Sequence, residues 1–570
     1  MIHVLSADTG ELTAEVCVIG AGPAGITTAL ELARLGCPVL LLESGGLKPS
    51  PQAQQLAEAT IRSPQHHAPM AVAVQRSLGG ASNLWGGRCV PLDALDFAAR
   101  LAVPNSGWPI GMHDFAPFLP AACAYLNCGE PEFSDPIPAL DIADRRFGVD
   151  RLERWSTRPR LKEAHGKTLR DSTRIELVLD ATVVNFAFAE DGRVRHVTVK
   201  APGSPPVAVH ARAFVVAAGG LENARLLLVA RRNAPQRFGG SEGPLGRYYM
   251  GHLYGSVAQA VFADQRLDAG LDYFFDGRGS YVRRRFTPSA EMQQAHGLQN
   301  IALWPEFPPL YDPGHRNSVL SLGYLALSLP PVGRMLVAES IRRSHIGAYV
   351  GAELRRGPHV LNLIRGMPQA AAFFPRFMYR RHFGRPPLPG FFQRSPHRRY
   401  AIRYHAEHAP DPESRVQLSA DRDALGVPRL DIDLRVAERD VDSVLRAHQC
   451  FAAWLADTGL GRMVWSYPAA ERRAALLRQS YDGHHQIGTT RMAATPRHGV
   501  VDADCRVFGA ANLFVAGSSV FPTSGQANPT LNAATLAVRL ARRIASELSR
   551  TERPQPELAL QRVRIPESVA

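Results

Sequence analysis

The sequence predicts an α/β fold of two connected domains, one assembled around a parallel sheet and one of α+β type built on an antiparallel sheet. Its 570 residues exceed the size of one ordinary core. Continuous apolar runs, typical of buried parallel strands, occur at three separated places, and the strands between them alternate between apolar and polar residues. The parallel-sheet domain is therefore expected to be discontinuous in the chain.

The elements of the parallel-sheet domain begin with a βαβ unit, because two parallel strands need a crossover helix between them. The pattern predicts a strand at 15–19, a helix at 23–35, a strand at 38–42, a strand at 214–217 followed by a helix from about 222, a strand at 513–516 and a helix at 531–549. Alternating strands are predicted at 196–200, 415–418 and 430–434, with a helix at 436–460. An antiparallel second domain fits residues from about 256 to 479.

A glycine-rich turn joins the first predicted strand to the first helix. Gly20 permits the tight turn, Gly22 lets the backbone approach a pyrophosphate, and Gly25 allows the helix to pack closely on the strand. The helix N-terminus adds a positive dipole, and Glu43 ends the next strand, where it can accept hydrogen bonds from a ribose. The motif predicts a dinucleotide in a Rossmann-like domain. An incidental glycine turn is the alternative, and the motif alone does not separate FAD from NAD.

A second glycine-rich stretch, residues 78–87, favours FAD. Gly79, Gly80, Gly86 and Gly87 let a loop lie flat against a planar ring system and its ribityl chain. Trp85 within it is costly to expose without something to pack against. A glycine-rich surface loop is the alternative interpretation.

Near the C-terminus, a histidine and an amide are candidates for chemistry on an alcohol. His485 can serve as a general base near neutral pH, and Asn528 can hold the same hydroxyl and orient its C–H bond. Asn528 followed by Pro529 is also a good helix start, so capping is the structural alternative. A helix starting here could also point its positive end at the N1–C2=O side of a flavin. His484 competes with His485, and the spacing to Gly488 favours His485.

With these motifs, the chain resembles the glucose–methanol–choline (GMC) oxidoreductases. The resemblance covers residues 20–25 with Glu43, 79–87, 218–220, 485–489 and 504–536. Residues 506–509, 512–514 and 527–531 look most like pyranose oxidases and related bacterial sugar or polyol oxidoreductases. The middle third of the chain, where substrate choice would reside, matches poorly.

The resemblance implies an FAD-dependent enzyme that oxidises an alcohol, with a sugar or polyol-like CH–OH group as substrate and hydride transfer to flavin N5. It assigns His485 as the catalytic base and Asn528 as its partner. Pyranose oxidases attach FAD covalently through a histidine, and Leu84 stands at the corresponding position here, which predicts non-covalent FAD. The alternatives are non-oxidative chemistry on the same scaffold (a lyase or decarboxylase) and a flavin-containing module for membrane or partner docking.

The expected FAD contacts and domain bounds follow from these assignments. The contacts are Gly20, Gly22, Pro23, Ala24, Gly25, Glu43, Ser44, Gly79, Gly80, Ser82, Asn83, Trp85, Gly86, Gly87, Val184, Ala218, Gly219, Gly517, Ser518, Asn528, Pro529 and Thr530. The FAD-binding domain is expected at 1–105, 165–255 and 480–550, the substrate domain at 106–164 and 256–479, and a tail at 551–570.

The net charge of +13 is concentrated in one segment. Between 341 and 400 there are twelve arginines and one acid, Glu353, interleaved with aromatic residues. A solvated basic face over part of the core, docking on anionic lipid, and binding of an anionic substrate or carrier are the open interpretations. Nucleic acid is not expected, because no recognition fold accompanies the charge. The electron acceptor (oxygen, a quinone or a protein) is left open.

Seven scattered cysteines without metal-ligand spacing predict reduced thiols and no metal site. No secretory signal and no uninterrupted apolar stretch of membrane-spanning length is evident. We therefore expect a cytoplasmic protein, with peripheral association on the inner face of the membrane as the alternative.

Overall fold

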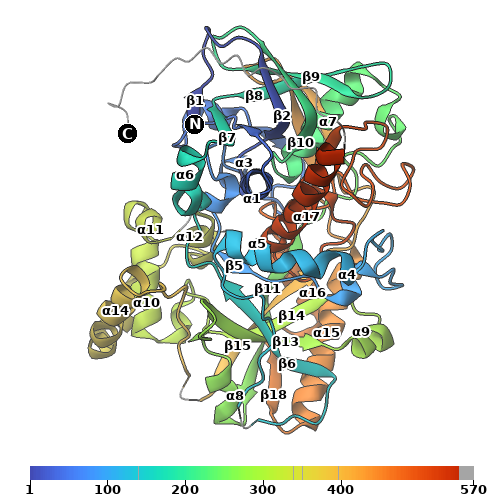
Figure 1. Ribbon diagram of the computed structural model, residues 1–570. Coiled ribbons are helices and arrows are strands. Elements are labelled where there is room, and N and C mark those ends of the chain that lie inside the picture. The colour runs from blue at the N-terminus through green and yellow to red at the C-terminus, as the bar shows by residue number, and fades with distance from the viewer. Residues whose placement is uncertain (139, 338, 349–350, 396, 551–570) are drawn as a thin grey trace.

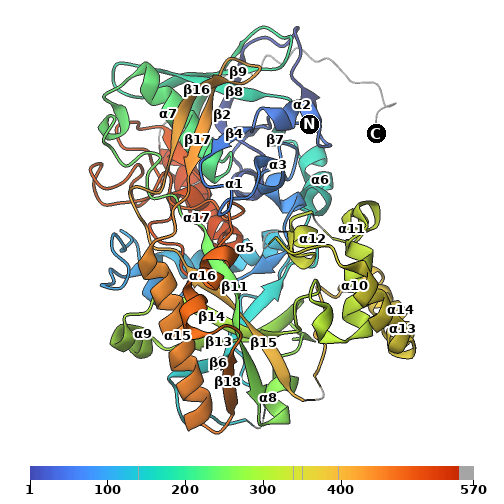
Figure 2. The same ribbon diagram turned by 180° about the vertical axis from the view of Figure 1, so that it is seen from behind.

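The computed structural model describes residues 1–138, 140–337, 339–348, 351–395 and 397–550. Two large sheets lie end to end, one above the other, and a lobe of helices projects from one side of the lower sheet (Figure 1). The view from behind shows the long helices α15 and α17 on the far side from that lobe (Figure 2).

The upper sheet is mostly parallel and has the strand order β1-β7-β3-β2-β10-β9-β8, with β19 paired to β10. Its strands are β1 (Ile2–Val4), β2 (Leu12–Ile19), β3 (Val39–Leu42), β7 (Ile175–Leu179), β8 (Thr182–Phe188), β9 (Val194–Lys200), β10 (Val207–Val216) and β19 (Leu513–Val515). The last four residues of β2 and all four of β3 are buried, because helices cover both faces of a parallel sheet. The covering helices include α1 (Pro23–Arg34), α7 (Gly220–Asn233) and α17 (Pro529–Arg550).

The lower sheet is antiparallel throughout its described pairs, with the order β18-β11-β15-β14-β13-β6-β5 and β12 paired to β13. Its strands are β5 (Arg88–Cys89), β6 (Phe147–Trp155), β11 (His252–Phe262), β12 (Phe274–Phe275), β13 (Tyr281–Pro288), β14 (Ile301–Glu306), β15 (Arg399–Glu407) and β18 (Gly461–Trp465). One face packs on α15 (Glu438–Asp457) through a core that includes Leu303, Tyr404 and Trp454. Because side chains alternate, His405 and Arg403 lie on the opposite, polar face.

A third, small sheet has the order β16-β17-β4. It consists of β16 (Arg415–Arg422), β17 (Pro428–Asp433) and β4 (Ala59–Ile61). Arg225 of α7 donates hydrogen bonds to the Pro428 carbonyl at 2.7 Å and to Asp423 at 2.7 Å. We assigned β16 and β17 by sequence to the substrate domain. They lie against α7 beside the upper sheet, and β17 pairs with β4, which is about 370 residues earlier in the chain.

The remaining helices are shorter. They are α2 (Pro51–Gln55), α3 (Met70–Ala73), α4 (Met112–Phe115), α5 (Leu119–Leu126), α6 (Leu161–Asp171), α8 (Gln265–Gly270), α9 (Ala290–His296), α10 (Ser318–Leu327), α11 (Pro330–Leu336), α12 (Glu339–His345), α13 (Arg356–Arg365), α14 (Met367–His382) and α16 (Arg472–Gln479). Short 3₁₀ turns are η1 (Gly80–Asn83), η2 (Ala94–Phe97), η3 (Ala116–Phe118), η4 (Arg237–Gly239), η5 (Pro313–His315), η7 (Ala469–Glu471) and η8 (Ser518–Val520).

Helices α10 to α14 make up the side lobe, which has a small core of its own around Leu320 and Tyr324. Within the described residues, no single helix has both the length and the apolar composition to cross a membrane. In the part of the chain that the structure describes, only α10 and α11 taken together reach those criteria, and the chain bends by 108° between them.

The predicted fold class is confirmed: a Rossmann-like half and an α+β half on an antiparallel sheet. The predicted helices at 23–35 and 436–460 are α1 and α15, shorter by one to three residues at their ends. The predicted helix from 531 starts two residues earlier, at Pro529.

Candidate active site

A cavity lies at the carboxyl ends of β2, β3 and β10, where the glycine-rich turn meets α1. Of the expected contacts, it is lined by Gly20, Gly22, Pro23, Ala24, Glu43, Ser44, Gly80, Ala218, Gly219, Gly517, Ser518, Pro529 and Thr530. Gly22 caps α1 without any side-chain hydrogen bond, so the first amides of this helix remain available to a ligand. The cavity therefore joins the N-terminus of α1 to that of α17.

The glycines of the turn serve two different purposes. Gly20 has φ +102°, and a Cβ there would lie 2.6 Å from the Ala217 carbonyl oxygen. A Cβ at Gly25 would lie 1.8 Å from the Gly20 carbonyl oxygen, so this position is closed to any side chain. At Gly22 and Gly219, by contrast, a Cβ would meet no atom within 4 Å. The first pair packs strand, helix and turn together, and the second pair borders open space where a pyrophosphate can approach.

Glu43 is buried at the end of β3 and lines the cavity. Its two carboxylate oxygens accept hydrogen bonds from the amides of Ala21 and Gly45, each at 2.9 Å. Burial raises its pKa, although these two hydrogen bonds act in the opposite direction. The carboxylate thus stays oriented at the cavity edge, where it can accept ribose hydroxyls.

Several predicted contacts do not line this cavity. In the second glycine-rich stretch only Gly80 and its neighbour Ala81 reach it. Ser82 donates to the Gly79 carbonyl at 2.5 Å, Asn83 to the Leu78 carbonyl at 3.0 Å and Trp85 to the Pro159 carbonyl at 2.7 Å. Gly25, Gly79, Gly86, Gly87 and Asn528 also lie outside the lining. Val183 lines the cavity where we predicted Val184, and the register of β8 shifts between residues 183 and 185.

Charged and amide side chains that we did not predict also line the cavity. Arg76 forms an ion pair with Glu222 at 2.9 Å and donates to Ser44 at 2.9 Å. Gln486 accepts from the Leu221 amide at 3.1 Å. Arg76 lies two residues before the second glycine-rich stretch. That proximity was the one signal in the sequence that could have pointed to it.

His485 and Asn528 meet in the structure. The Asn528 side-chain amide lies 3.2 Å from Nε2 of His485. On the other side of the ring, Nδ1 lies 3.1 Å from Oδ2 of Asp482. The Asp482 carboxylate also accepts backbone amides from His252 at 2.7 Å, His484 at 3.0 Å and His485 at 3.1 Å. A carboxylate that accepts at Nδ1 places the ring proton there and leaves the Nε2 lone pair facing outward.

The charge of Asp482 is stabilised by this arrangement. Burial by itself would raise its pKa, but the charge of His485 and the hydrogen bond with it hold the pKa well below the usual range. Asp482 is therefore ionised, which is the state in which it accepts hydrogen bonds. The competing histidine, His484, turns away from this pair and lines the dinucleotide cavity.

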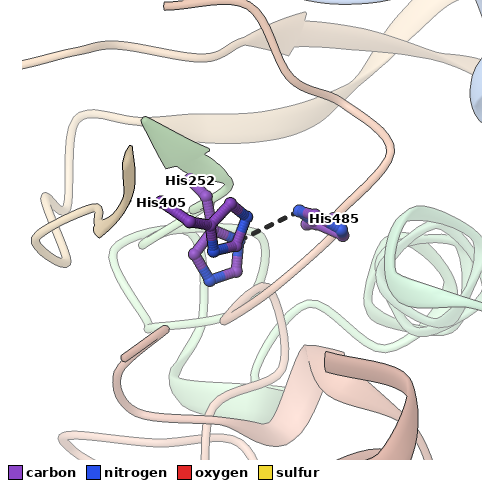
Figure 3. Close-up of side chains that lie close together, drawn as sticks. All are labelled: His252, His405 and His485. Atoms are coloured by element: carbon purple, nitrogen blue, oxygen red, sulfur yellow. Dashed lines mark hydrogen bonds between the residues drawn. The ribbon is translucent and has the colours of Figure 1, made fainter. Parts of the chain in front are cut away.

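Two further histidines complete a cluster around His485 (Figure 3). His252 Nδ1 lies 3.0 Å from His485 Nδ1, and the rings of His252 and His405 stack at 4.3 Å. Burial lowers the pKa of both His252 and His405, and the neighbouring histidines and arginines lower it further. Nε2 of each ring is buried and has no hydrogen-bond partner among the described residues. Two neutral imidazoles thus offer polar atoms beside the His485–Asn528 pair.

Two segments of the chain match known protein families. Residues 410–537 match the family model described as GMC oxidoreductase, and residues 13–66 match an FAD binding domain. A C-glycoside 3-oxidase of Arthrobacter globiformis is 39% identical over 128 residues, 22% of this chain and 23% of that protein. Residues 410–537 are thus similar to the GMC oxidoreductases, and residues 13–66 to an FAD binding domain. The fructose dehydrogenase large subunit of Gluconobacter japonicus is 30% identical over 155 residues, 26% of each protein.

These alignments span about a quarter of the length of the curated relatives. Among solved structures, a fungal aryl-alcohol oxidase superposes with TM-score 0.53 at 14% identity, over 95% of this chain and 100% of that chain. At this level of identity, the similarity shows that the two proteins share a fold.

The matched FAD binding domain makes FAD the cofactor of this protein. The dinucleotide cavity has the features that FAD requires. Open space borders Gly22 and Gly219, the amides of α1 are free of side-chain caps, and a buried carboxylate stands at the end of β3. The residues present therefore fit this group.

A second cavity, of about 870 Å³, lies on the polar face of the lower sheet, against the side lobe. Ser256 of β11, Glu306 of β14 and Arg403 of β15 line it on the sheet side, and His345 of α12 on the lobe side. Arg403 is two residues from His405 on the same face, about 7 Å along the strand. The clustered histidines themselves do not line this cavity, which has the size of a site for a small organic molecule.

Proposed function

We propose that this protein oxidises a secondary alcohol of a sugar or polyol to a carbonyl, with His485 as the general base and FAD as the hydride acceptor. The observation that carries the proposal is the pair formed by His485 Nε2 and the Asn528 amide at 3.2 Å. The names of two relatives, a C-glycoside 3-oxidase and a fructose dehydrogenase large subunit, support a sugar-like substrate.

The proton chemistry follows from the protein's own side chains. A substrate hydroxyl displaces the Asn528 amide from Nε2 and gives its proton to that nitrogen. Asn528 then donates to the substrate oxygen and orients the C–H bond. Asp482 keeps the Nδ1 proton in place and stabilises the imidazolium that forms. Nε2 of His252 and of His405 can hydrogen-bond further hydroxyls, which suits a polyhydroxylated substrate.

The assignment of FAD contacts is part of the same proposal. We infer that the amides at the start of α1 bind the pyrophosphate, that Glu43 accepts the ribose hydroxyls, and that the start of α17 faces the flavin. Leu84 stands where pyranose oxidases carry the linking histidine, which supports non-covalent attachment.

An anaerobic substrate panel tests the proposed oxidation. We expect a sugar or polyol to bleach the flavin absorbance stoichiometrically, and an oxygen pulse to show whether oxygen restores it. If no alcohol in the panel reduces the flavin, the non-oxidative alternative is favoured and the oxidation proposal fails.

A second proposal concerns the side lobe, which we infer docks on a bilayer rich in anionic lipid. Large apolar side chains are exposed on its helices and adjoining segments, namely Met335, Leu354, Val360, Leu361, Ile364, Met367, Tyr379 and Phe383. Exposed arginines, including Arg365 and Arg376, share α13 and α14 with them. Apolar groups at the acyl boundary beside cations at the headgroups are typical of interfacial binding. Flotation with vesicles tests this proposal.

A further inference from the structure

Three arginines and one carboxylate share the polar face of the lower sheet. Pairing register sets Arg283 of β13 opposite Glu153 of β6, and Arg88 of β5 opposite Trp155 of β6, so these side chains lie on one face. Arg285 lies two residues from Arg283 on the same strand and also faces this side. This arginine cluster, defined as Arg88, Arg283 and Arg285, is largely buried: Arg285 is 2% exposed, Arg283 is 5% exposed, and the side chain of Arg88 is 16% exposed.

The arginine cluster carries more positive charge than the protein neutralises. Glu153 contacts both Arg88 and Arg283, and it is the one carboxylate in direct contact with the cluster among the described residues. Three guanidinium groups against one carboxylate leave a local charge of about +2. Two further acids act on the cluster from a longer distance, and both already have partners. Asp93 accepts from Gln526 at 3.1 Å and from Asn300 at 3.0 Å, and Glu306 is paired with Arg403 at 3.0 Å. Buried charge that is not matched costs free energy, so such an excess calls for an anion.

Two donors of the cluster are left without a partner. Nη2 of Arg88 and Nε of Arg285 are buried and make no hydrogen bond to any described residue. The other two nitrogens of Arg285 donate to the side-chain oxygen of Gln526 at 2.6 Å and to the Leu152 carbonyl at 3.5 Å. Burial lowers the pKa of Arg88 and brings that of Arg285 to about 10, in line with guanidinium groups that lack sufficient counter-charge.

The cluster lies beside the candidate catalytic pair. The backbone carbonyl of Gln526, whose side chain binds Arg285, accepts from Nδ1 of His405 at 2.7 Å. The His405 ring is 5.5 Å from that of His485. Arg88 stacks on Trp304 at 4.5 Å, and Trp304 is paired in register with Arg403, which lines the second cavity. An anion held by the cluster is therefore close to a hydroxyl held by His485.

We propose that Arg88 and Arg285 bind the carboxylate of the substrate, and that the substrate is a sugar acid, such as a uronate or an aldonate, whose hydroxyl lies at His485. This inference rests on the proposed alcohol oxidation. A planar carboxylate can accept from both unpartnered guanidinium donors, and charge-assisted hydrogen bonds of this kind are about twice as strong as neutral ones. The aromatic ring of Trp304 supplies an apolar wall for the sugar carbons.

Binding without turnover tests the subsite on the FAD-loaded protein. Tetrahydropyran-2-carboxylate has the ring and the charge but no hydroxyl, and tetrahydropyran-2-methanol is its neutral counterpart. We expect the acid to raise the Tm and perturb the flavin spectrum with a Kd at least about 10-fold lower than that of the neutral compound. Equal affinities in the unaltered protein would overturn the proposal, and this comparison requires no variant.

Variants locate the effect. Arg88→Gln and Arg285→Gln should weaken binding of the acid by about 10- to 100-fold and leave binding of the neutral compound unchanged. Arg284→Gln is the matched control, because Arg284 is on the same strand but faces the other way and binds Asp135. The assignment is contradicted if Arg284→Gln loses the preference for the acid over the neutral compound. It is also contradicted if Arg88→Gln and Arg285→Gln both keep that preference.

Oxidation of matched substrates separates the two proposals. D-glucuronate and D-glucose, and D-gluconate and D-glucitol, are compared by anaerobic flavin bleaching. Faster bleaching by the acids, lost in Arg88→Gln, supports the subsite. If neutral sugars bleach the flavin as well as the acids do, the subsite is wrong while the oxidation stands. If tetrahydropyran-2-carboxylate binds through Arg88 and no hydroxyl compound bleaches, the subsite stands and the oxidation fails.

Discussion

Asp482 holds His485 at two points: its carboxylate accepts the backbone amide and lies 3.1 Å from the ring Nδ1. The two residues are three apart in sequence, so a single turn of chain provides both the base and the group that orients it. The same carboxylate accepts the amide of His252 at the start of β11, which ties this turn to the lower sheet. The base is therefore fixed relative to both halves of the protein.

His485→Ala removes the proposed base and leaves the dinucleotide cavity intact, because His485 does not line it. We expect full FAD content, shown by the flavin absorbance, and a rate of anaerobic bleaching lower by about 10²- to 10⁴-fold. Unimpaired bleaching in a variant that retains FAD would contradict the role of His485.

Asp482→Asn tests the orienting role of Asp482. An amide can replace the carboxylate sterically, but it no longer stabilises the imidazolium or secures the Nδ1 proton. We expect kcat to fall by about 10²-fold or more, with KM and FAD content little changed. A change confined to KM or to thermal stability would assign Asp482 a structural role only.

The depressed pKa of Asp482 also makes a prediction about acid stability. A folded-state pKa below the unfolded value of about 3.9 contributes stability above that pH, and this contribution is lost as pH falls through the folded pKa. Denaturant unfolding of Asp482→Asn should therefore show a deficit in the free energy of unfolding near pH 7 that shrinks below about pH 4. A deficit in the free energy of unfolding that grows as the pH falls would contradict this stabilising role of the Asp482 charge.

Asn528 has two candidate roles, as the partner of His485 and as the cap of α17. Its side-chain Oδ1 accepts no hydrogen bond from any described residue, so the structure does not show the cap, and Asn528→Ser tests both roles. Serine can still cap the start of α17, but its shorter side chain does not reach Nε2 of His485. We expect an unchanged Tm and a kcat lower by about 10²-fold. A lower Tm with unaltered kcat would indicate that Asn528 only starts the helix.

Gly22→Ala should separate cofactor binding from folding. A Cβ at Gly22 meets no protein atom within 4 Å, so the polypeptide should fold, but it points into the space where a pyrophosphate would lie. We expect a folded protein, by circular dichroism, with FAD affinity at least about 10-fold lower. Gly10→Ala, which also meets no atom within 4 Å, is the control and should bind FAD normally.

If the side lobe docks on membranes, the protein should float with vesicles that contain anionic lipid. It should not float with vesicles of neutral lipid. Each arginine near such a surface contributes about 1 kcal/mol, so binding should weaken sharply at high salt. Ile364→Glu combined with Phe383→Glu, at side chains exposed by 60% and 72%, should abolish flotation with no effect on flavin content. Flotation that depends on neither salt nor these residues would argue against the lobe as the membrane-docking surface.

The dinucleotide half was determined largely by the sequence itself. The βαβ unit, the turn at Gly20 and the helix at Pro529 depend on local periodicity and on glycine and proline, whose conformational effects act over a few residues. The predicted fingerprint at Gly20, Gly22 and Glu43 therefore coincides with a cavity in the structure. His485 and Asn528 were identified by the same local motifs, although their meeting at 3.2 Å is a tertiary result.

Only the tertiary structure decided what surrounds that pair. His252, His405 and the arginine cluster come from strands far apart in sequence, and pairing register decides which face each side chain takes. A shift of one residue would turn Arg285 or His405 toward the opposite, apolar face. Arg76 and Glu222 reach the dinucleotide cavity in the same way, through long-range packing. Because register depends on contacts between distant segments, no local pattern in the sequence could have placed the histidines and the arginine cluster.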